Sequence, residues 1–316
     1  MSPVIETILF IFGLVALGYL AGLTGYLKAE VGDGIAAFAV SVALPLLLFS
    51  TMANVDFHGA APWGLWAAYF TAIVVAWTAG HLTVTRIFGR DGAAGVVGGV
   101  TTSFSNIVLL GIPFMMGVFG QDGFEILSLL ISVHLPIMMM ASIVLFQIFG
   151  RDRAVPVKTM ELIRDFLWKL LTNPLVVGIL CGLLWRAVGQ PLPALASRFV
   201  DALADIASPL ALFAVGLGLR KFGISGNVRP ALAIAGLKLF LLPAVVLCTA
   251  WLFGLPPLTA KVAVAAAALP AGVNSYLIAT QFGTGQALAS SAMTIGTGAA
   301  VVTTAIWLSI ASMVFG

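Results

Sequence analysis

Long apolar runs follow one another along the chain, separated by short connections that hold most of the charged and turn-forming residues. A helix that crosses a bilayer needs about 20 apolar residues, so each run is a candidate span. The pattern predicts an all-α membrane protein with ten transmembrane helices. The predicted spans are roughly 3–27, 34–54, 62–87, 93–118, 123–149, 171–188, 202–219, 230–254, 258–282 and 286–315.

The composition agrees with this pattern. Of the 316 residues, 61% are hydrophobic and 9% are charged, whereas soluble proteins have roughly 45 to 50% and about 25%. The 34 glycines lie inside the apolar runs without a three-residue period. Such placement is typical of close helix packing in a bilayer and excludes fibrous or disordered chains.

The placement of charge predicts an orientation. The net charge of +3 is too sparse and scattered for a nucleic-acid surface. If the N-terminus lies outside, the inner connections hold eleven Lys and Arg residues and the outer ones three. Positive residues concentrate on the cytoplasmic side. We therefore expect an inner (plasma) membrane protein with both termini outside, and a basic cytoplasmic linker at 150–170 between halves 1–149 and 171–316.

Five spans in each half mean that the halves start from opposite sides of the membrane. If the halves are homologous, they form an inverted repeat. Glycine pairs in spans one and six predict tight helix contact, and prolines in spans two and seven predict kinks. The matching positions are Gly18 and Gly22 with Gly178 and Gly182, Pro45 with Pro209, Asn106 with Asn274, and Phe119-Gly120 with Phe282-Gly283.

Spans four and nine are the least helix-like. Span four places polar residues at 101–106 ahead of Pro113, and span nine places Pro270 and Gly272 ahead of Asn274. A proline frees a backbone carbonyl, which hydrocarbon tolerates only where other groups or water satisfy it. Corresponding broken spans in inverted halves predict a transport site at the midplane, where helix N-termini face an anion.

Asn106 and Asn274 are the central candidates for substrate binding, with Ser105 and Ser275 beside them. Ser50 in span two is a further candidate for substrate binding. An amide offers both donors and an acceptor, so it can bind a carboxylate. The alternative is that each asparagine only caps or bridges a broken helix end. Their occurrence as a pair favours the binding site.

Three ionisable residues lie within or beside the predicted spans. Lys238 lies in the middle of span eight and needs a partner or water, and Asp205 is the predicted partner. Either the two residues form a structural ion pair, or Lys238 helps to attract the substrate carboxylate or exchanges its Asp partner during transport. Histidine is the side chain whose charge ordinarily changes between pH 5 and 8, so His134 in span five is either a proton carrier or a packed, hydrogen-bonded residue. No metal-ligand spacing or cofactor motif is found, so neither a metal nor a cofactor is expected.

The chain resembles the auxin efflux carrier family, which includes plant PIN-type auxin exporters and bacterial carriers of malate and malonate. The residues that carry the resemblance are 106–120, 269–272, 173–195 and 205–219. The resemblance implies the fold of bile acid symporters and sodium-proton antiporters, with two inverted five-helix repeats that cross at spans four and nine. It also implies an elevator-like movement and a carboxylate at the crossing.

By matching motif, Asn106 is the span-four asparagine, Pro270 the crossover proline and Pro45 the span-two proline of the family. PIN exporters have a serine soon after the span-two proline, where this chain has Leu48 with Ser50 nearby. The Asp and Lys of their span three are absent here. The resemblance therefore favours a small carboxylate over auxin as the substrate.

The predicted function is a secondary active transporter of small organic anions. No nucleotide-binding Gly-x-x-x-x-Gly-Lys motif is found. One alternative is a sodium-coupled symporter of the bile acid type. Others are a passive channel and an intramembrane enzyme with Asp201, Asp205 or His134 as acid and base, although no catalytic motif supports the enzyme. The expected partners are the anion, the bilayer and a second copy of the chain.

Overall fold

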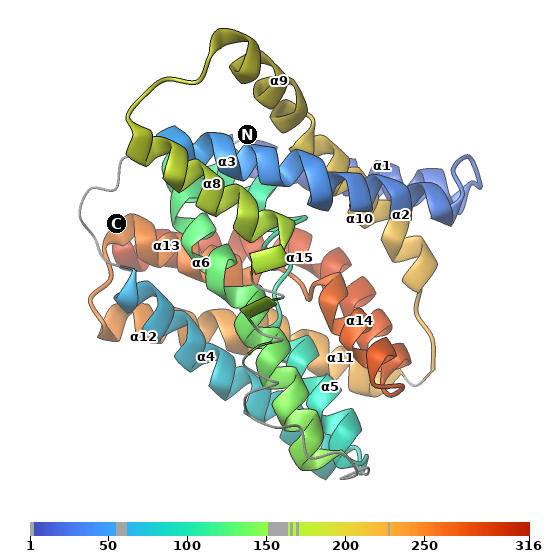
Figure 1. Ribbon diagram of the computed structural model, residues 1–316. Helices are drawn as coiled ribbons and strands as arrows, with labels where there is room; N and C mark the ends of the chain where they lie inside the picture. The colour runs from blue at the N-terminus through green and yellow to red at the C-terminus, as the bar shows by residue number, and fades with distance from the viewer. Residues whose placement is uncertain (1–2, 55–61, 151–163, 165–166, 169–170, 227) are drawn as a thin grey trace. The chain divides into compact units, whose positions relative to one another are not determined.

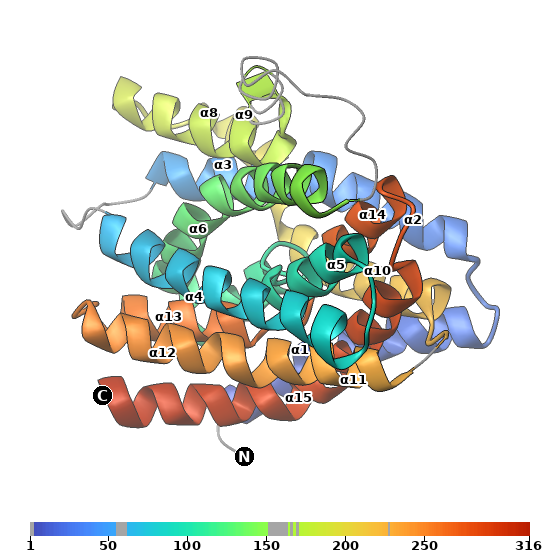
Figure 2. The same ribbon diagram turned by 90° about the horizontal axis from the view of Figure 1, so that it is seen from below.

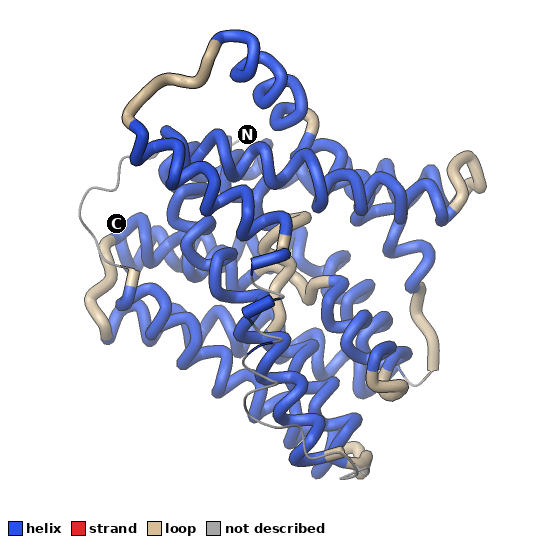
Figure 3. The backbone as a smooth tube through the Cα atoms, viewed as in Figure 1, coloured by secondary structure: helices blue, strands red, loops and turns tan. Residues whose placement is uncertain are grey.

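The computed structural model describes residues 3–54, 62–150, 164, 167–168, 171–226 and 228–316. Helices make up nearly all of this part of the chain, and no strand is drawn in it (Figure 1, Figure 3). The all-α prediction is therefore confirmed for the described residues. The predicted linker at 150–170 lies mostly outside them.

Seven helical segments among the described residues are long and apolar enough to cross a membrane. Two shorter apolar helices, Pro174–Val188 and Pro257–Ala268, fall in the sixth and ninth predicted spans. The ten crossings and the inverted repeat stay predictions. The seven segments are Val4–Leu23, Glu30–Asn54, Trp63–Ile87, Gly111–Phe149, Ala194–Arg220, Val228–Leu252 and Gln286–Phe315.

The chain forms two compact units, and each takes segments from both sequence halves. Unit 1 comprises Met1–Ala61, Val108–Pro136 and Ile163–Lys221; unit 2 comprises Pro62–Ile107, Ile137–Leu162 and Phe222–Gly316. The compact units are therefore not the halves 1–149 and 171–316.

Unit 1 holds the glycine pairs that the sequence predicts as packing faces. Its helices are α1 (Pro3–Leu23), α2 (Ala29–Phe38), the π-turn η1 (Ala39–Ala43), α3 (Leu44–Asn54), the first part of α6 (Gly111–Phe149), α8 (Pro174–Val188), α9 (Ala194–Asp205) and nearly all of α10 (Ala207–Phe222).

A Cβ at Gly18 would overlap the carbonyl oxygen of Phe213, and one at Gly178 would overlap the carbonyl oxygen of Pro45. The glycines thus let α1 approach α10 and α8 approach α3, which lie side by side in Figure 1. The predicted close packing is confirmed.

Prolines stand in the first turns of helices in unit 1. Pro45 follows the π-turn η1 as the second residue of α3, and Pro209 follows a break at Ile206 as the third residue of α10. Pro209 is tolerated because the N–H groups of a first turn have no helical acceptor. Pro45 lies within the continuous helical segment Glu30–Asn54, directly after the π-turn. The predicted kinks of spans two and seven stay predictions. Pro113 likewise stands in the first turn of α6, after the break in span four rather than within it.

Unit 2 contains all of span nine and the part of span four up to Ile107. Its elements are α4 (Trp63–Leu82), the π-turn η2 (Thr83–Ile87), α5 (Gly92–Ser103), the last part of α6, α11 (Val228–Gly236), the π-turn η3 (Leu237–Leu241), α12 (Leu242–Leu252), α13 (Pro257–Ala268), α14 (Val273–Gln281) and α15 (Gln286–Phe315). Figure 2 shows α12 between α4 and α15.

The half-helices α5 and α13 are rich in small residues, which let neighbouring helices pack closely around them. From Ala94 to Ser103 every residue of α5 is buried, and so is every residue of α13 from Val262 to Ala268. A Cβ at Gly98 would overlap the side chain of Val84, and one at Gly99 the indole of Trp77. Close packing against α4 thus depends on glycines, whereas α13 uses alanines.

Both Phe-Gly pairs end a helical segment, as the sequence predicts. Gly120 interrupts α6 with a φ of 66°, and Gly283 follows α14 with a φ of 69°. This left-handed conformation favours glycine because it has no Cβ.

Candidate functional site: a crossing of two broken helices

The breaks in spans four and nine meet in unit 2. Residues 104–110 separate α5 from α6, and residues 269–272 separate α13 from α14. Ser105 and Ala271 form an isolated antiparallel bridge between the two breaks. The non-helical segments therefore cross, as predicted.

Backbone hydrogen bonds join the crossing segments. The N–H of Asn106 donates to the carbonyl of Pro270, and the N–H of Gly272 donates to the carbonyl of Phe104, each at 2.9 Å. Irregular backbone at membrane depth must satisfy its polar groups within the protein or in a water-filled cavity. Each broken segment thus donates one backbone hydrogen bond to a carbonyl of the other.

Gly272 allows the close approach of the two backbones and precedes α14. A Cβ there would lie 3.3 Å from the Cα of Asn106. The carbonyl of Gly272 accepts hydrogen bonds from the N–H of Ser275 at 3.1 Å and from its hydroxyl at 2.7 Å. The first turn of α14 is thereby fixed against the break.

Asn106 and Asn274 lie at this crossing, as predicted. The backbone of Asn106 lies against Gly272, two residues before Asn274, and both side chains are partly exposed. Within the described part of the chain, neither side-chain amide makes a hydrogen bond, and α14 has no side-chain cap. The capping alternative therefore has no support, and both amides are available to a ligand.

The predicted binding serines are placed differently. Ser105 and Ser275 are buried, at 1% and 0% exposure, and their hydroxyls make intramolecular hydrogen bonds. Both support the crossing, and a direct contact with substrate stays a prediction. Ser50 lies in α3 of unit 1, and its predicted role is likewise untested.

Tyr69 is a supporting residue that the sequence did not reveal. It is fully buried in α4, and its hydroxyl donates to the Ser105 Oγ at 3.2 Å. A buried tyrosine hydroxyl needs a partner, but the identity of that partner depends on how α4 packs against the crossing.

Lys238 has a different partner from the predicted one. Its Nζ donates to the carbonyls of Ala267 at 2.7 Å and Leu269 at 2.6 Å, and its side chain is 1% exposed. These carbonyls at the end of α13 have no helical donors. The ammonium therefore meets backbone dipoles where the sequence predicted the carboxylate of Asp205, which ends α9 with an exposed side chain.

His134 is buried in the part of α6 that belongs to unit 1. A function as a proton carrier stays a prediction.

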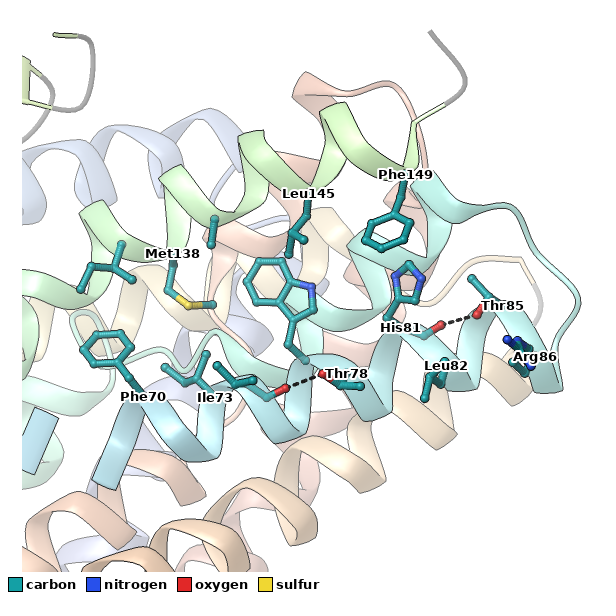
Figure 4. Close-up of a pocket in the computed structure, with 14 residues that line it drawn as sticks. Phe70, Ile73, Thr78, His81, Leu82, Thr85, Arg86, Met138, Leu145 and Phe149 are labelled. Atoms are coloured by element: carbon teal, nitrogen blue, oxygen red, sulfur yellow. Dashed lines mark hydrogen bonds between the residues drawn. The ribbon is translucent and has the colours of Figure 1, made fainter. Parts of the chain in front are cut away.

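A cavity lies between α4 and the last part of α6, with a volume of about 1060 Å³ (Figure 4). Its described lining is mostly apolar, with Arg86 at one end. The hydroxyls of Thr78 and Thr85 in its wall donate to backbone carbonyls one turn earlier. The mostly apolar interior thus offers few donors to a carboxylate.

Apolar helices of membrane-spanning length, together with two interrupted helices that cross within one unit, define a polytopic membrane protein of the transporter class. The chain belongs to the family described as "Membrane transport protein", whose pattern matches residues 3–308, and which includes the auxin efflux carriers that the sequence resembles. Family membership indicates a transport protein rather than an enzyme.

Three relatives align with most of the chain. An uncharacterized transporter of Methanothermobacter thermautotrophicus is 22% identical over 96% of both chains. A putative malonate transporter of Rhizobium meliloti is 25% identical over 96% of this chain and 94% of its own. Auxin efflux carrier component 8 of Arabidopsis thaliana is 24% identical over 68% of this chain and 71% of its own.

Proposed function

We propose that this protein is a secondary active transporter that carries small organic anions across the cytoplasmic membrane. Carboxylates such as malonate, malate or an auxin-like acid are the proposed substrates. The observation that carries the proposal is the pair of partly exposed, unbonded amides at a buried helix crossing. The name of the Rhizobium relative supports the same substrate class.

In the proposed site the amide NH₂ groups of Asn106 and Asn274 donate to the substrate carboxylate. The first backbone N–H groups of α14 add donors and the positive end of a helix dipole. Neutral donors suit this task because an anion can bind and leave without breaking an ion pair. Ser105 and Ser275 position the two backbones.

Alternating access is proposed to be elevator-like. The bridge between Ser105 and Ala271, the backbone hydrogen bonds around it, and both Asn106 and Asn274 belong to unit 2. A site contained in one unit can travel as a block when that unit moves against the other. We further propose ten crossings with both termini outside, and assembly as a homodimer.

Thermal unfolding of the detergent-purified protein tests the proposal with malonate, malate, succinate and indole-3-acetate, at two pH values with and without sodium. A ligand present at about 100 times its dissociation constant stabilises the folded state by roughly 2.7 kcal/mol. We expect a dose-dependent shift with at least one acid. The absence of a shift with all four acids would reject the carboxylate site.

Asn106→Ala and Asn274→Ala locate the site. Each is expected to abolish the shift while leaving the unfolding temperature without ligand unchanged, because neither amide has an intramolecular partner to lose. Gln147→Ala is the matched control, since it removes a partly exposed amide from α6 of the same unit. Unchanged affinity in both asparagine variants would contradict binding at the crossing.

A further inference from the structure

The carbonyl end of α13 is occupied by a side chain of the protein itself. In transporters with interrupted helices, C-terminal carbonyls of half-helices and unwound backbone coordinate the coupling cation. Here the Lys238 ammonium binds two such oxygens, of Ala267 and Leu269, at 2.7 and 2.6 Å. The distances are those of strong charge-assisted hydrogen bonds.

The described helices that pack against Lys238 offer no carboxylate to form an ion pair with it or to coordinate a metal cation. Among the described elements, helices α4, α5, α11, α12, α13 and α15 pack against η3, which carries Lys238. None of these six helices contains an Asp or Glu. Backbone carbonyl dipoles therefore compensate the buried charge.

The local backbone positions Lys238 to reach the carbonyls of Ala267 and Leu269. It is the second residue of the π-turn η3, and π-turns are frequent at functional sites. The indole Nε1 of Trp307 in α15 donates to the carbonyl of Leu239 at 2.8 Å, which satisfies one oxygen of the turn.

A single residue connects the ammonium to the proposed substrate site. Leu269, whose carbonyl binds Lys238, directly precedes Pro270, whose carbonyl accepts from the N–H of Asn106. A positive charge at this position fixes the end of α13 and favours an anion at the crossing.

We propose that Lys238 is a tethered cation that occupies the place of a coupling ion, so that the anion site operates without sodium. The proposal rests on the proposed function, since it names the ionic requirement of that site. It replaces the sodium-coupled alternative, because the carbonyl oxygens that a sodium ion would need already hold an ammonium group.

The test measures cation dependence without any organic anion. The unfolding temperature of the wild type is expected to be equal in sodium chloride and in choline chloride. Lys238→Ala removes the ammonium and leaves its space empty, and is expected to unfold roughly 5 to 10 °C lower in choline chloride. Sodium or propylammonium is expected to restore part of this loss in a dose-dependent way.

Lys261→Ala is the matched control, because it removes a lysine of α13 whose ammonium binds the Gly316 carbonyl at an exposed position. It is expected to show no cation dependence. Lys238→Arg keeps a cation and is expected to remain stable in choline chloride even if Lys238→Ala does not fold.

Two results would overturn the proposal. One is a wild type that sodium stabilises over choline, and the other is a Lys238→Ala protein that unfolds like the wild type in choline chloride. Failure of the carboxylate panel would reject the substrate class alone, since the cation experiment uses no acid.

Discussion

The two half-helices that end at the crossing, α5 and α13, are built alike but are held by different chemistry. Both consist of small residues and are buried, and each ends where it meets the other's break. The neutral hydroxyl of Tyr69 supports the first break through Ser105, whereas the ammonium of Lys238 holds the second at Leu269.

The difference shows that a shared backbone arrangement need not share its electrostatics. The helix before each break comes from a different half of the chain, yet only the second half supplies a buried cation among these supports. Among these supports, the positive charge near the crossing therefore comes from the second half of the chain, whereas each half supplies one asparagine amide.

The largest effect is expected from removing the charged support. Lys238→Met leaves the carbonyls of Ala267 and Leu269 without their donor, and we expect a loss of about 3 kcal/mol of stability. Denaturant or thermal unfolding in detergent measures it. A stability equal to that of the wild type would mean that the ammonium is not needed to hold α13.

A smaller effect is expected from overpacking the α5 side. In Gly98→Val the new side chain would collide with Val84 and with the backbone of Gly80 in α4, at a cost of about 2 kcal/mol. Gly236→Ala is the control, because a Cβ there meets nothing within 4 Å. If the two variants unfold alike, close glycine packing does not hold α5 in place.

The smallest effect is expected from the neutral support. Tyr69→Phe removes one buried hydrogen bond of 3.2 Å to Ser105, worth about 1 kcal/mol. Tyr19→Phe in α1 serves as a control for loss of a hydroxyl elsewhere. If Tyr69→Phe destabilised the protein as much as Lys238→Met, the neutral support of the first break would be as strong as the charged support of the second, contrary to our expectation.

The sequence predicts the features that are local or repeated. Apolar runs of bilayer length give the helices, the Phe-Gly pairs give the segment ends at Gly120 and Gly283, and the repeated motif gives Asn106 and Asn274 at the crossing. Each of these signals is contained in one short stretch, so no knowledge of packing is needed.

The supports of the crossing could not be predicted in the same way. Lys238 binds backbone carbonyls 29 and 31 residues away, and Tyr69 binds a serine 36 residues away. A backbone carbonyl has no signature in the sequence, which is why a carboxylate, Asp205, was the natural prediction. The partners follow from how η3 and α4 pack, and that depends on the whole unit.

Counterflow in proteoliposomes tests the central claim most directly. Vesicles loaded with unlabelled malonate are placed in trace radiolabelled malonate, in sodium-free buffer. The account predicts transient accumulation of label by the wild type and by Gln147→Ala, and none by the Asn106→Ala/Asn274→Ala double variant. Accumulation by the double variant at the wild-type rate, or none by the wild type with malonate, malate, succinate or indole-3-acetate, would contradict it.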